Sequence, residues 1–138
     1  MGNNSINSVY QGGMAFSTLI NGHDITIDLN KAGGGNNLGT SPKILMLVSL
    51  AGCTGVDVVG ILNKMRVNFS DLSINIEAHL TEEHPKIYDD VIVIYTIKVD
   101  KENEEKVKKA VDLSQETYCG VSKMFRAFAK LSSKIIYL

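Results

Sequence analysis

The sequence predicts one α+β domain in which helices pack against an antiparallel sheet. Two observations carry this prediction. Apolar residues alternate with polar ones in several short runs, whereas one long central stretch is apolar on nearly all sides. The resulting order of elements is strands, helix, strands, helices, strand. A chain of 138 residues is long enough for one domain with a substantial core, so residues 1–138 are expected to form a single domain.

The first third of the chain predicts a β-hairpin, a loop and a helix. Residues 14–20 and 23–29 flank an Asn-Gly pair, which is typical of a tight hairpin turn because both central residues take positive φ. Residues 31–42 have the composition of a loop. Pro42 then opens a helix that runs to about Arg66. Because this helix is apolar nearly all round, we expect its whole surface to be covered.

The rest of the chain alternates between strand and helix patterns. The β-branched run at 89–99 is expected to be a central strand, and the charged stretch at 101–115 an amphipathic helix with a solvated face. The predicted elements are strands at 72–80 and 89–99, helices at 101–115 and 119–131, and a closing strand at 132–138.

Composition and charge exclude several classes of protein. The formal net charge is −1 and no basic run is present, so nucleic-acid binding is not expected. The apolar stretch from Ile44 to Val56 is too short and too polar for a membrane span. The N-terminal MGNNSINS lacks the features of a signal peptide, so a cytoplasmic protein is expected. In that compartment two cysteines are free or redox-active rather than a permanent disulfide.

Two motifs that resemble ligand sites are set aside. The segment GGNNLGTS at 34–41 has phosphate-loop glycines but lacks the lysine before Thr40, and it follows a hairpin instead of a parallel strand. His79 and His84 are five residues apart and face opposite sides of a strand. Neither a metal nor another cofactor is expected.

The two cysteines are the remaining candidates for chemistry. The chain contains no CxxC motif, and Cys119 begins a predicted helix, where the partial positive charge of the helix end favours thiolate. Cys53 lies in the middle of a helix and gains no such help. Asp57 follows one turn later on the same face, where it would raise a thiol pKa unless a donor holds it. The residues alone leave open a redox pair or two independent buried cysteines, and Asp57 is assigned neither a structural nor a catalytic role.

Three separated motifs resemble those of the OsmC/Ohr superfamily of thiol-dependent hydroperoxide reductases. They are SLAGCTGVDVVGILNKMR, TEEHPKIYDD and VDLSQETYCGVSKMF, in the same order as in the family. The resemblance implies an OsmC-like fold with long central helices, and two chains that intertwine as a homodimer with active sites at their interface. It also implies that Cys53 is the peroxidatic thiol, that Cys119 is the resolving thiol, and that the protein serves oxidative-stress defence.

The implied reaction needs two small partners. An organic hydroperoxide would oxidise Cys53, and a dithiol reductant would restore the Cys53–Cys119 pair. Specific substrate-binding residues are not assigned. The apolar character of the sequence suggests a pocket lined from these residues: Met46, Leu50, Val56, Met124 and Phe125.

The chain departs from the peroxidases of this family at the positions that activate the thiolate. Lys43 follows Pro42 where those enzymes have Glu, the segment QGGMAF has no Arg, and Gly120 follows Cys119 where Pro is common. Arg126, about two helical turns after Cys119, is a possible cation. Two alternatives therefore stand beside the peroxidase: a thiol sensor or disulfide-exchange protein, and a module that binds a hydrophobic ligand.

Overall fold

The computed structural model describes residues 2–138 and forms two compact units, the first ending at Leu47 and the second comprising Val48–Leu138. The first unit holds a three-stranded sheet and a short 3-10 helix, and the helix α1 begins at its end. Its elements are β1 (Ser8–Tyr10), β2 (Phe16–Ile20), β3 (His23–Ile27) and η1 (Lys31–Gly33). The second unit holds α1 (Pro42–Lys64) beyond its first turns, β4 (Ser70–Leu80), β5 (Tyr88–Lys98), η2 (Lys101–Asn103), α2 (Glu104–Leu113), the π-helix η3 (Ser114–Tyr118), α3 (Gly120–Arg126) and β6 (Lys130–Tyr137).

The predicted hairpin of the first unit is present. β2 and β3 pair antiparallel, and the turn residues Asn21 and Gly22 have φ of 51° and 82°. Both values lie in the left-handed region that this two-residue turn requires. β1 was not predicted from the sequence; it pairs with the free edge of β2 over only three residues.

The glycine-rich loop of the first unit surrounds a carboxylate of its own chain. Asp28 is buried, and its side chain accepts backbone N–H bonds of 2.7, 3.1 and 3.1 Å from Leu29, Asn36 and Leu38. These bonds, chiefly the one from Leu38, lower the pKa of Asp28. The loop therefore uses its N–H groups to hold Asp28.

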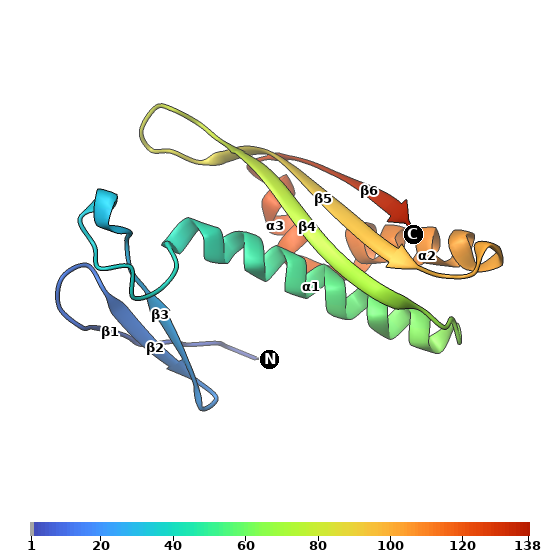
Figure 1. Cartoon of the computed structure of the whole chain (residues 1–138), viewed down its shortest axis with the longest axis horizontal. Helices are drawn as coiled ribbons and strands as arrows, with labels where there is room; N and C mark the ends of the chain where they lie inside the picture. The colour runs from blue at the N-terminus through green and yellow to red at the C-terminus, as the bar shows by residue number, and fades with distance from the viewer. Residues whose placement is uncertain (1) are drawn as a thin grey trace. The chain divides into compact units, whose positions relative to one another are not determined.

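The sheet of the second unit has the order β4-β5-β6, so β5 is the central strand, as the sequence predicts (Figure 1). β4 and β5 pair antiparallel, but β6 runs parallel to β5. The expectation of a wholly antiparallel sheet is therefore wrong for one pair of strands. The reason is the connection: α2, η3 and α3 form a crossover between β5 and β6, and a crossover returns the chain in the same direction.

Alternate residues of β5 form the centre of the second unit's core. Val91, Val93, Tyr95 and Ile97 are buried on one face of the strand. Tyr95 contacts α1 and η3 through hydrogen bonds, which identifies this face as the one that the helices cover.

Helix α1 begins and ends close to the predicted positions. Its buried residues are spaced by four and form one stripe: Leu50, Thr54, Val58 and Leu62. Much of the remaining apolar surface is exposed, with Val48 57% and Val56 71% exposed. The expected cover on all sides is thus not supplied within one chain. The helix ends where Arg66 takes a φ of 58° and the N–H of Val67 bonds to the carbonyl of Leu62.

By length and composition alone α1 could cross a membrane, because the helix is longer than the apolar stretch that the sequence suggested. The contacts of α1 indicate instead that it packs inside the protein. Thr54 in the buried stripe bonds to the hydroxyls of Tyr95 and Ser114. These bonds join α1 to the core of the second unit, so we interpret it as a core helix.

The third predicted helix, 119–131, is shorter in the structure. α3 covers only Gly120–Arg126, and β6 begins at Lys130, opposite Asp90 of the central strand. Pairing with β5 therefore outweighs the helical pattern of residues 130 and 131.

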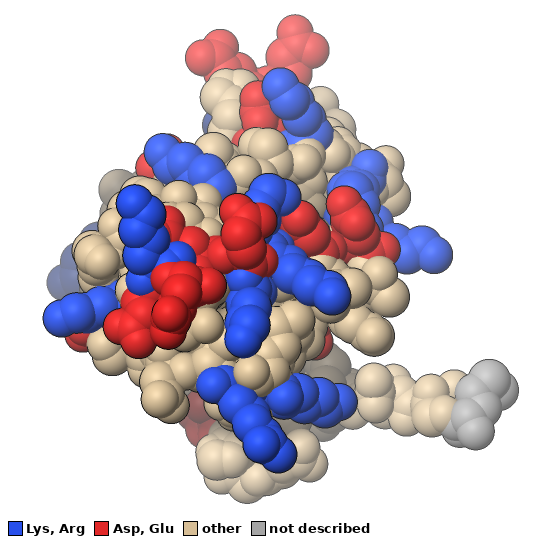
Figure 2. Space-filling model, turned by 90° about the vertical axis from the view of Figure 1, so that its right-hand side faces the viewer, with Lys and Arg blue, Asp and Glu red and all other residues tan. Residues whose placement is uncertain are grey.

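On the face drawn in Figure 2, basic and acidic side chains intermingle, which is not the single-sign patch that nucleic-acid binding requires.

Candidate active site

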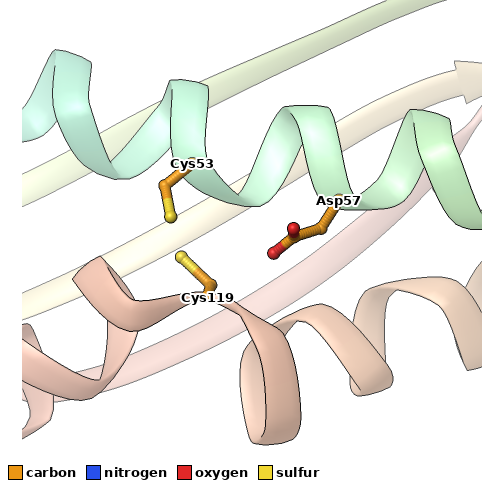
Figure 3. Close-up of side chains that lie close together, drawn as sticks. All are labelled: Cys53, Asp57 and Cys119. Carbon is orange, nitrogen blue, oxygen red and sulfur yellow. The ribbon is translucent and has the colours of Figure 1, made fainter. Parts of the chain in front are cut away.

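Two thiols and a carboxylate converge in the second unit (Figure 3). Cys53 and Asp57 lie one turn apart on α1, and Cys119 lies between η3 and α3. The two sulfur atoms and a carboxylate oxygen are all within 4.8 Å of one another, and the sulfurs point toward each other. Both cysteines are free thiols. The structure thus brings together the two cysteines that are 66 positions apart in the sequence.

Cys119 is fixed by backbone contacts on both sides. Its N–H donates to the carbonyl of Ser114 at 2.7 Å, which is the five-residue bond of a π-helix. Its Sγ accepts the N–H of Ser122 at 3.3 Å, so that Cys119 caps the start of α3, as its sequence position predicts. The side chain is only 3% exposed. The sulfur is therefore held in one direction, toward Cys53.

Cys53 is half-buried, and its surroundings raise its pKa. Burial is the largest cause, and the neighbouring Cys119 and Asp57 add to it, whereas the backbone N–H of Val121 lowers the pKa. None of the main influences comes from a Lys or Arg among residues 2–138. At neutral pH this environment favours the thiol of Cys53 over the thiolate.

Asp57 is held by a serine from the opposite helical segment. The Ser114 hydroxyl donates to Asp57 Oδ2 at 3.0 Å, and a buried chain of hydroxyls continues behind it. Thr54 Oγ1 lies 2.7 Å from Ser114 Oγ and 2.6 Å from the Tyr95 hydroxyl, and Gln115 Nε2 donates to that hydroxyl at 2.6 Å. The sequence left Asp57 unassigned; the structure gives it both a hydrogen-bond donor and a position beside the thiols.

The direction of this hydrogen-bond chain follows from its two ends. A carboxylate only accepts and an amide nitrogen only donates, and each hydroxyl has one proton. The Ser114 hydroxyl therefore donates its hydrogen bond to Asp57 and accepts one from Thr54. Thr54 in turn accepts from Tyr95, and Tyr95 accepts from Gln115. All four donors of the chain thus point toward Asp57. Desolvation raises the pKa of Tyr95, so that this hydroxyl stays protonated as the chain requires.

Comparison with known proteins identifies the family. Residues 33–134 match the model of the family described as OsmC-like protein. The chain belongs to the OsmC-like family. Protein YhfA of Escherichia coli strain K12 is 31% identical over 103 residues, which are 75% of this chain and 74% of YhfA. This OsmC-like chain thus has a curated relative over most of its length.

Solved structures support the same assignment. A hypothetical protein from Aquifex aeolicus VF5 is 30% identical, with a TM-score of 0.82, and the match covers 100% of this chain and 99% of that one. An organic hydroperoxide resistance protein OsmC from Legionella pneumophila is 17% identical, with a TM-score of 0.69 and 99% of each chain covered. The second likeness shows a shared fold. The expected OsmC-like α+β fold is confirmed.

A pocket of about 490 Å³ opens beside Asp57 in this OsmC-like protein. Its lining is mostly apolar: Val56, Asp57, Gly60, Ile61, Lys64, Met65, Leu113 and Tyr118. The predicted substrate pocket is wrong in two of its members, because Leu50 and Phe125 are 0% and 1% exposed and belong to the core. Their apolar character reflects packing. Of the five suggested residues, only Val56 lines this pocket.

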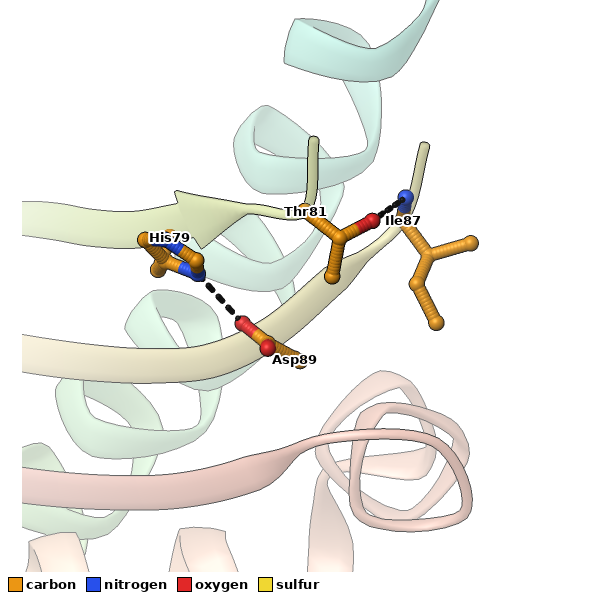
Figure 4. Close-up of polar contacts among 4 residues, drawn as sticks. All are labelled: His79, Thr81, Ile87 and Asp89. Carbon is orange, nitrogen blue, oxygen red and sulfur yellow. Dashed lines mark hydrogen bonds and ion pairs between the residues drawn. The ribbon is translucent and has the colours of Figure 1, made fainter. Parts of the chain in front are cut away.

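Neither of the suggested cations, Arg126 and Lys43, is among the main influences on Cys53. Arg126 donates from Nη1 to the carbonyl of Gln115 at 2.7 Å, which ties α3 to η3. Lys43 lies in the first turn of α1 and belongs to the first unit. His79 is used elsewhere: its Nδ1 lies 2.7 Å from Asp89 across the β4–β5 pair, and this neighbour raises its pKa (Figure 4).

Sequence reasoning missed the hydroxyl chain behind Asp57. Tyr95 looks like one more apolar residue of a central strand, and Ser114 and Gln115 look like the end of an amphipathic helix. One signal was available: Thr54 lies in the stripe of α1 that the i,i+4 pattern buries, and a buried hydroxyl needs a partner.

Proposed function

We propose that this protein is a thiol-dependent peroxidase that reduces small organic hydroperoxides with Cys53 and Cys119. The observation that carries the proposal is the approach of the two sulfur atoms, which lie within 4.8 Å and face each other. A disulfide has an S–S length of about 2.05 Å, so an approach of less than about 3 Å joins them. Two inert cysteines of a ligand-binding module would have no reason to be paired in this way.

In the proposed reaction Cys53 attacks first. Its thiolate attacks an oxygen of the hydroperoxide and the O–O bond breaks, which leaves Cys53 as a sulfenic acid and an alkoxide that takes up a proton to become the alcohol. The Cys119 sulfur then attacks the Cys53 sulfur, which forms the disulfide and releases water. A dithiol reductant restores both thiols by exchange and becomes a disulfide itself.

Exposure supports this assignment of roles. Cys53 is half-buried and reachable, whereas Cys119 is buried. A hydroperoxide therefore meets Cys53 first, and Cys119 is positioned to react only with a group already on Cys53. The apolar pocket beside Asp57 is a candidate site for the organic part of the substrate.

The proposal includes a homodimer. Val48 and Val56 are among the exposed apolar residues of α1, and soluble proteins rarely leave a continuous apolar surface of this kind uncovered. Gly52 and Gly60 have open space where a side chain would stand, which leaves room for a second chain to approach. We take the cytoplasm as the compartment, since the cycle depends on a dithiol reductant.

The test uses the reduced full-length protein and a small excess of cumene hydroperoxide. Intact mass measured over seconds follows the loss of two hydrogens as the disulfide forms. We expect the disulfide in the natural chain, sulfenic acid in Cys119→Ser, and neither product in Cys53→Ser. Oxidation no faster than that of a free cysteine would refute the peroxidase.

A second function is favoured by one observation. The main influences on Cys53 include no cation that would orient a peroxide, although the two thiols face each other. A paired dithiol without such a cation also suits disulfide exchange or thiol sensing. Because the raised pKa of Cys53 slows both reactions at neutral pH, the test compares their rates: exchange with a small-molecule disulfide that is faster than reaction with hydroperoxide would select this function.

A further inference from the structure

The candidate site offers three metal-ligand atoms at close range. They are the sulfurs of Cys53 and Cys119 and a carboxylate oxygen of Asp57, all within 4.8 Å of one another. In a tetrahedral zinc site, with Zn–S of about 2.3 Å and Zn–O of about 2.1 Å, neighbouring ligand atoms lie roughly 3.4–3.8 Å apart. Small side-chain rotations are enough to reach this spacing.

We propose that the reduced protein binds one Zn²⁺ per chain through Cys53, Cys119 and Asp57, with a water molecule as the fourth ligand. Two thiolates and a carboxylate are ligands that zinc accepts, and thiolates select against magnesium and calcium. The pocket next to Asp57 is open enough to supply the water. A site with three protein ligands and an open fourth position is a known arrangement for zinc.

Contacts around the three side chains resemble those that surround metal ligands. The N–H of Ser122 donates to Cys119, the N–H of Val121 acts on Cys53, and the hydroxyl of Ser114 donates to Asp57. Outer contacts of this kind orient ligands and are typical of metal sites. The buried hydroxyl chain holds the Asp57 carboxylate in one orientation through the 3.0 Å bond from Ser114.

The charges of the site give zinc binding a physical reason. Three groups that are anionic when deprotonated lie within 4.8 Å of one another. A divalent cation between them would neutralise most of the charge that they carry together. Binding proceeds as the two thiols release two protons and two Zn–S bonds form. Zinc affinity is therefore expected to rise with pH.

Zinc binding does not depend on the proposed peroxidase, although both use the same cysteines. While bound, the metal holds both thiolates apart from an oxidant. When a hydroperoxide does react, the two thiolates give it two electrons, two protons are taken up, and the products are the disulfide, an alcohol, water and free Zn²⁺. The site would then link zinc release to oxidation.

The experiment titrates the reduced, metal-free full chain with Co²⁺ and then displaces it with Zn²⁺. We expect one cobalt per chain, a thiolate-to-cobalt charge-transfer absorption, and displacement by one equivalent of zinc. Cys53→Ser and Cys119→Ser should each lose most of that absorption. Ser114→Ala, which removes a contact to a ligand, should lower the zinc affinity roughly 10- to 100-fold. Asp57→Asn, which removes a ligand, should lower it by more than that.

Asp112→Asn is the matched control, because Asp112 is an exposed carboxylate paired with Lys108 and should leave zinc affinity unchanged. The oxidised natural chain is a second control that needs no substitution, and it should not bind cobalt. Absence of the charge-transfer absorption, or equal zinc affinity in Asp57→Asn and Asp112→Asn, would overturn the inference. If the metal-free protein still forms the disulfide with hydroperoxide, the proposed function stands without the zinc site.

Discussion

Tyr95→Phe tests the buried hydroxyl chain by removing one oxygen and keeping the ring. Tyr95 is buried in the core, and its hydroxyl makes two hydrogen bonds of 2.6 Å, to Thr54 and from Gln115. A buried hydrogen bond contributes a net of about 1 kcal/mol, so the loss of two costs about 2 kcal/mol. In this variant the Gln115 amide can still donate to Thr54 Oγ1, which lies 3.5 Å away. We therefore add no further free-energy cost for a buried donor without a partner.

The matched control is Tyr137→Phe. That hydroxyl makes one bond, to the carbonyl of Glu104 at 2.9 Å, in a part-buried position. The expected loss is about 1 kcal/mol or less. Both variants are measured by urea unfolding at one fixed protein concentration, because an oligomer would make the apparent stability depend on concentration.

The result is the difference between the two variants. We expect the free energy of unfolding to fall by about twice as much in Tyr95→Phe as in Tyr137→Phe, with the urea dependence unchanged in both. Equal losses, or a smaller loss in Tyr95→Phe, would refute the view that the chain from Gln115 to Asp57 is a fully bonded buried network.

Three further predictions follow from the pKa directions. Because the pKa of Cys53 is raised, its alkylation by iodoacetamide, followed by peptide mass, should keep accelerating about tenfold per pH unit beyond about pH 8.5, the usual pKa of cysteine. A rate that levels off below that pH would contradict this prediction. The pKa of His79 measured by NMR should exceed 6.5 and return to about that value in Asp89→Asn, whereas no change would show that Asp89 is not the cause. The pKa of Asp28 lies below 3.8, so its stabilising effect is present above that pH and is lost as pH falls through the folded value. Urea unfolding should therefore show Asp28→Asn destabilised at pH 7 but close to the natural chain at low pH, with faster exchange of the Leu38 amide.

Local patterns in the sequence were enough to predict most of the helices and strands. The Asn21-Gly22 turn and the start of α1 at Pro42 depend on residues next to one another, so a sequence shows them directly. The direction of β6 and the end of α3 depend on pairing with β5, which lies more than 30 residues earlier. No local pattern carries that information.

The candidate site, too, has one part that local spacing predicts and another that depends on tertiary packing. Cys53 and Asp57 share a helix face, and their closeness follows from a spacing of four. That Cys119 stands opposite them was implied by a family resemblance and not by spacing. The contact from Ser114 to Asp57 joins residues 57 positions apart, and only tertiary packing brings them together.

The π-helix at Ser114–Tyr118 ties two parts of the site to one residue. Ser114 binds Cys119 through its carbonyl and Asp57 through its hydroxyl, and the cysteine follows Ser114 by five positions. In an α-helix the corresponding bond spans four positions, so the π-turn holds one residue more than an α-helical turn between the same two groups. A single residue thus anchors both the carboxylate and the backbone of the second thiol. A change that moved Ser114 would therefore disturb Asp57 and Cys119 together.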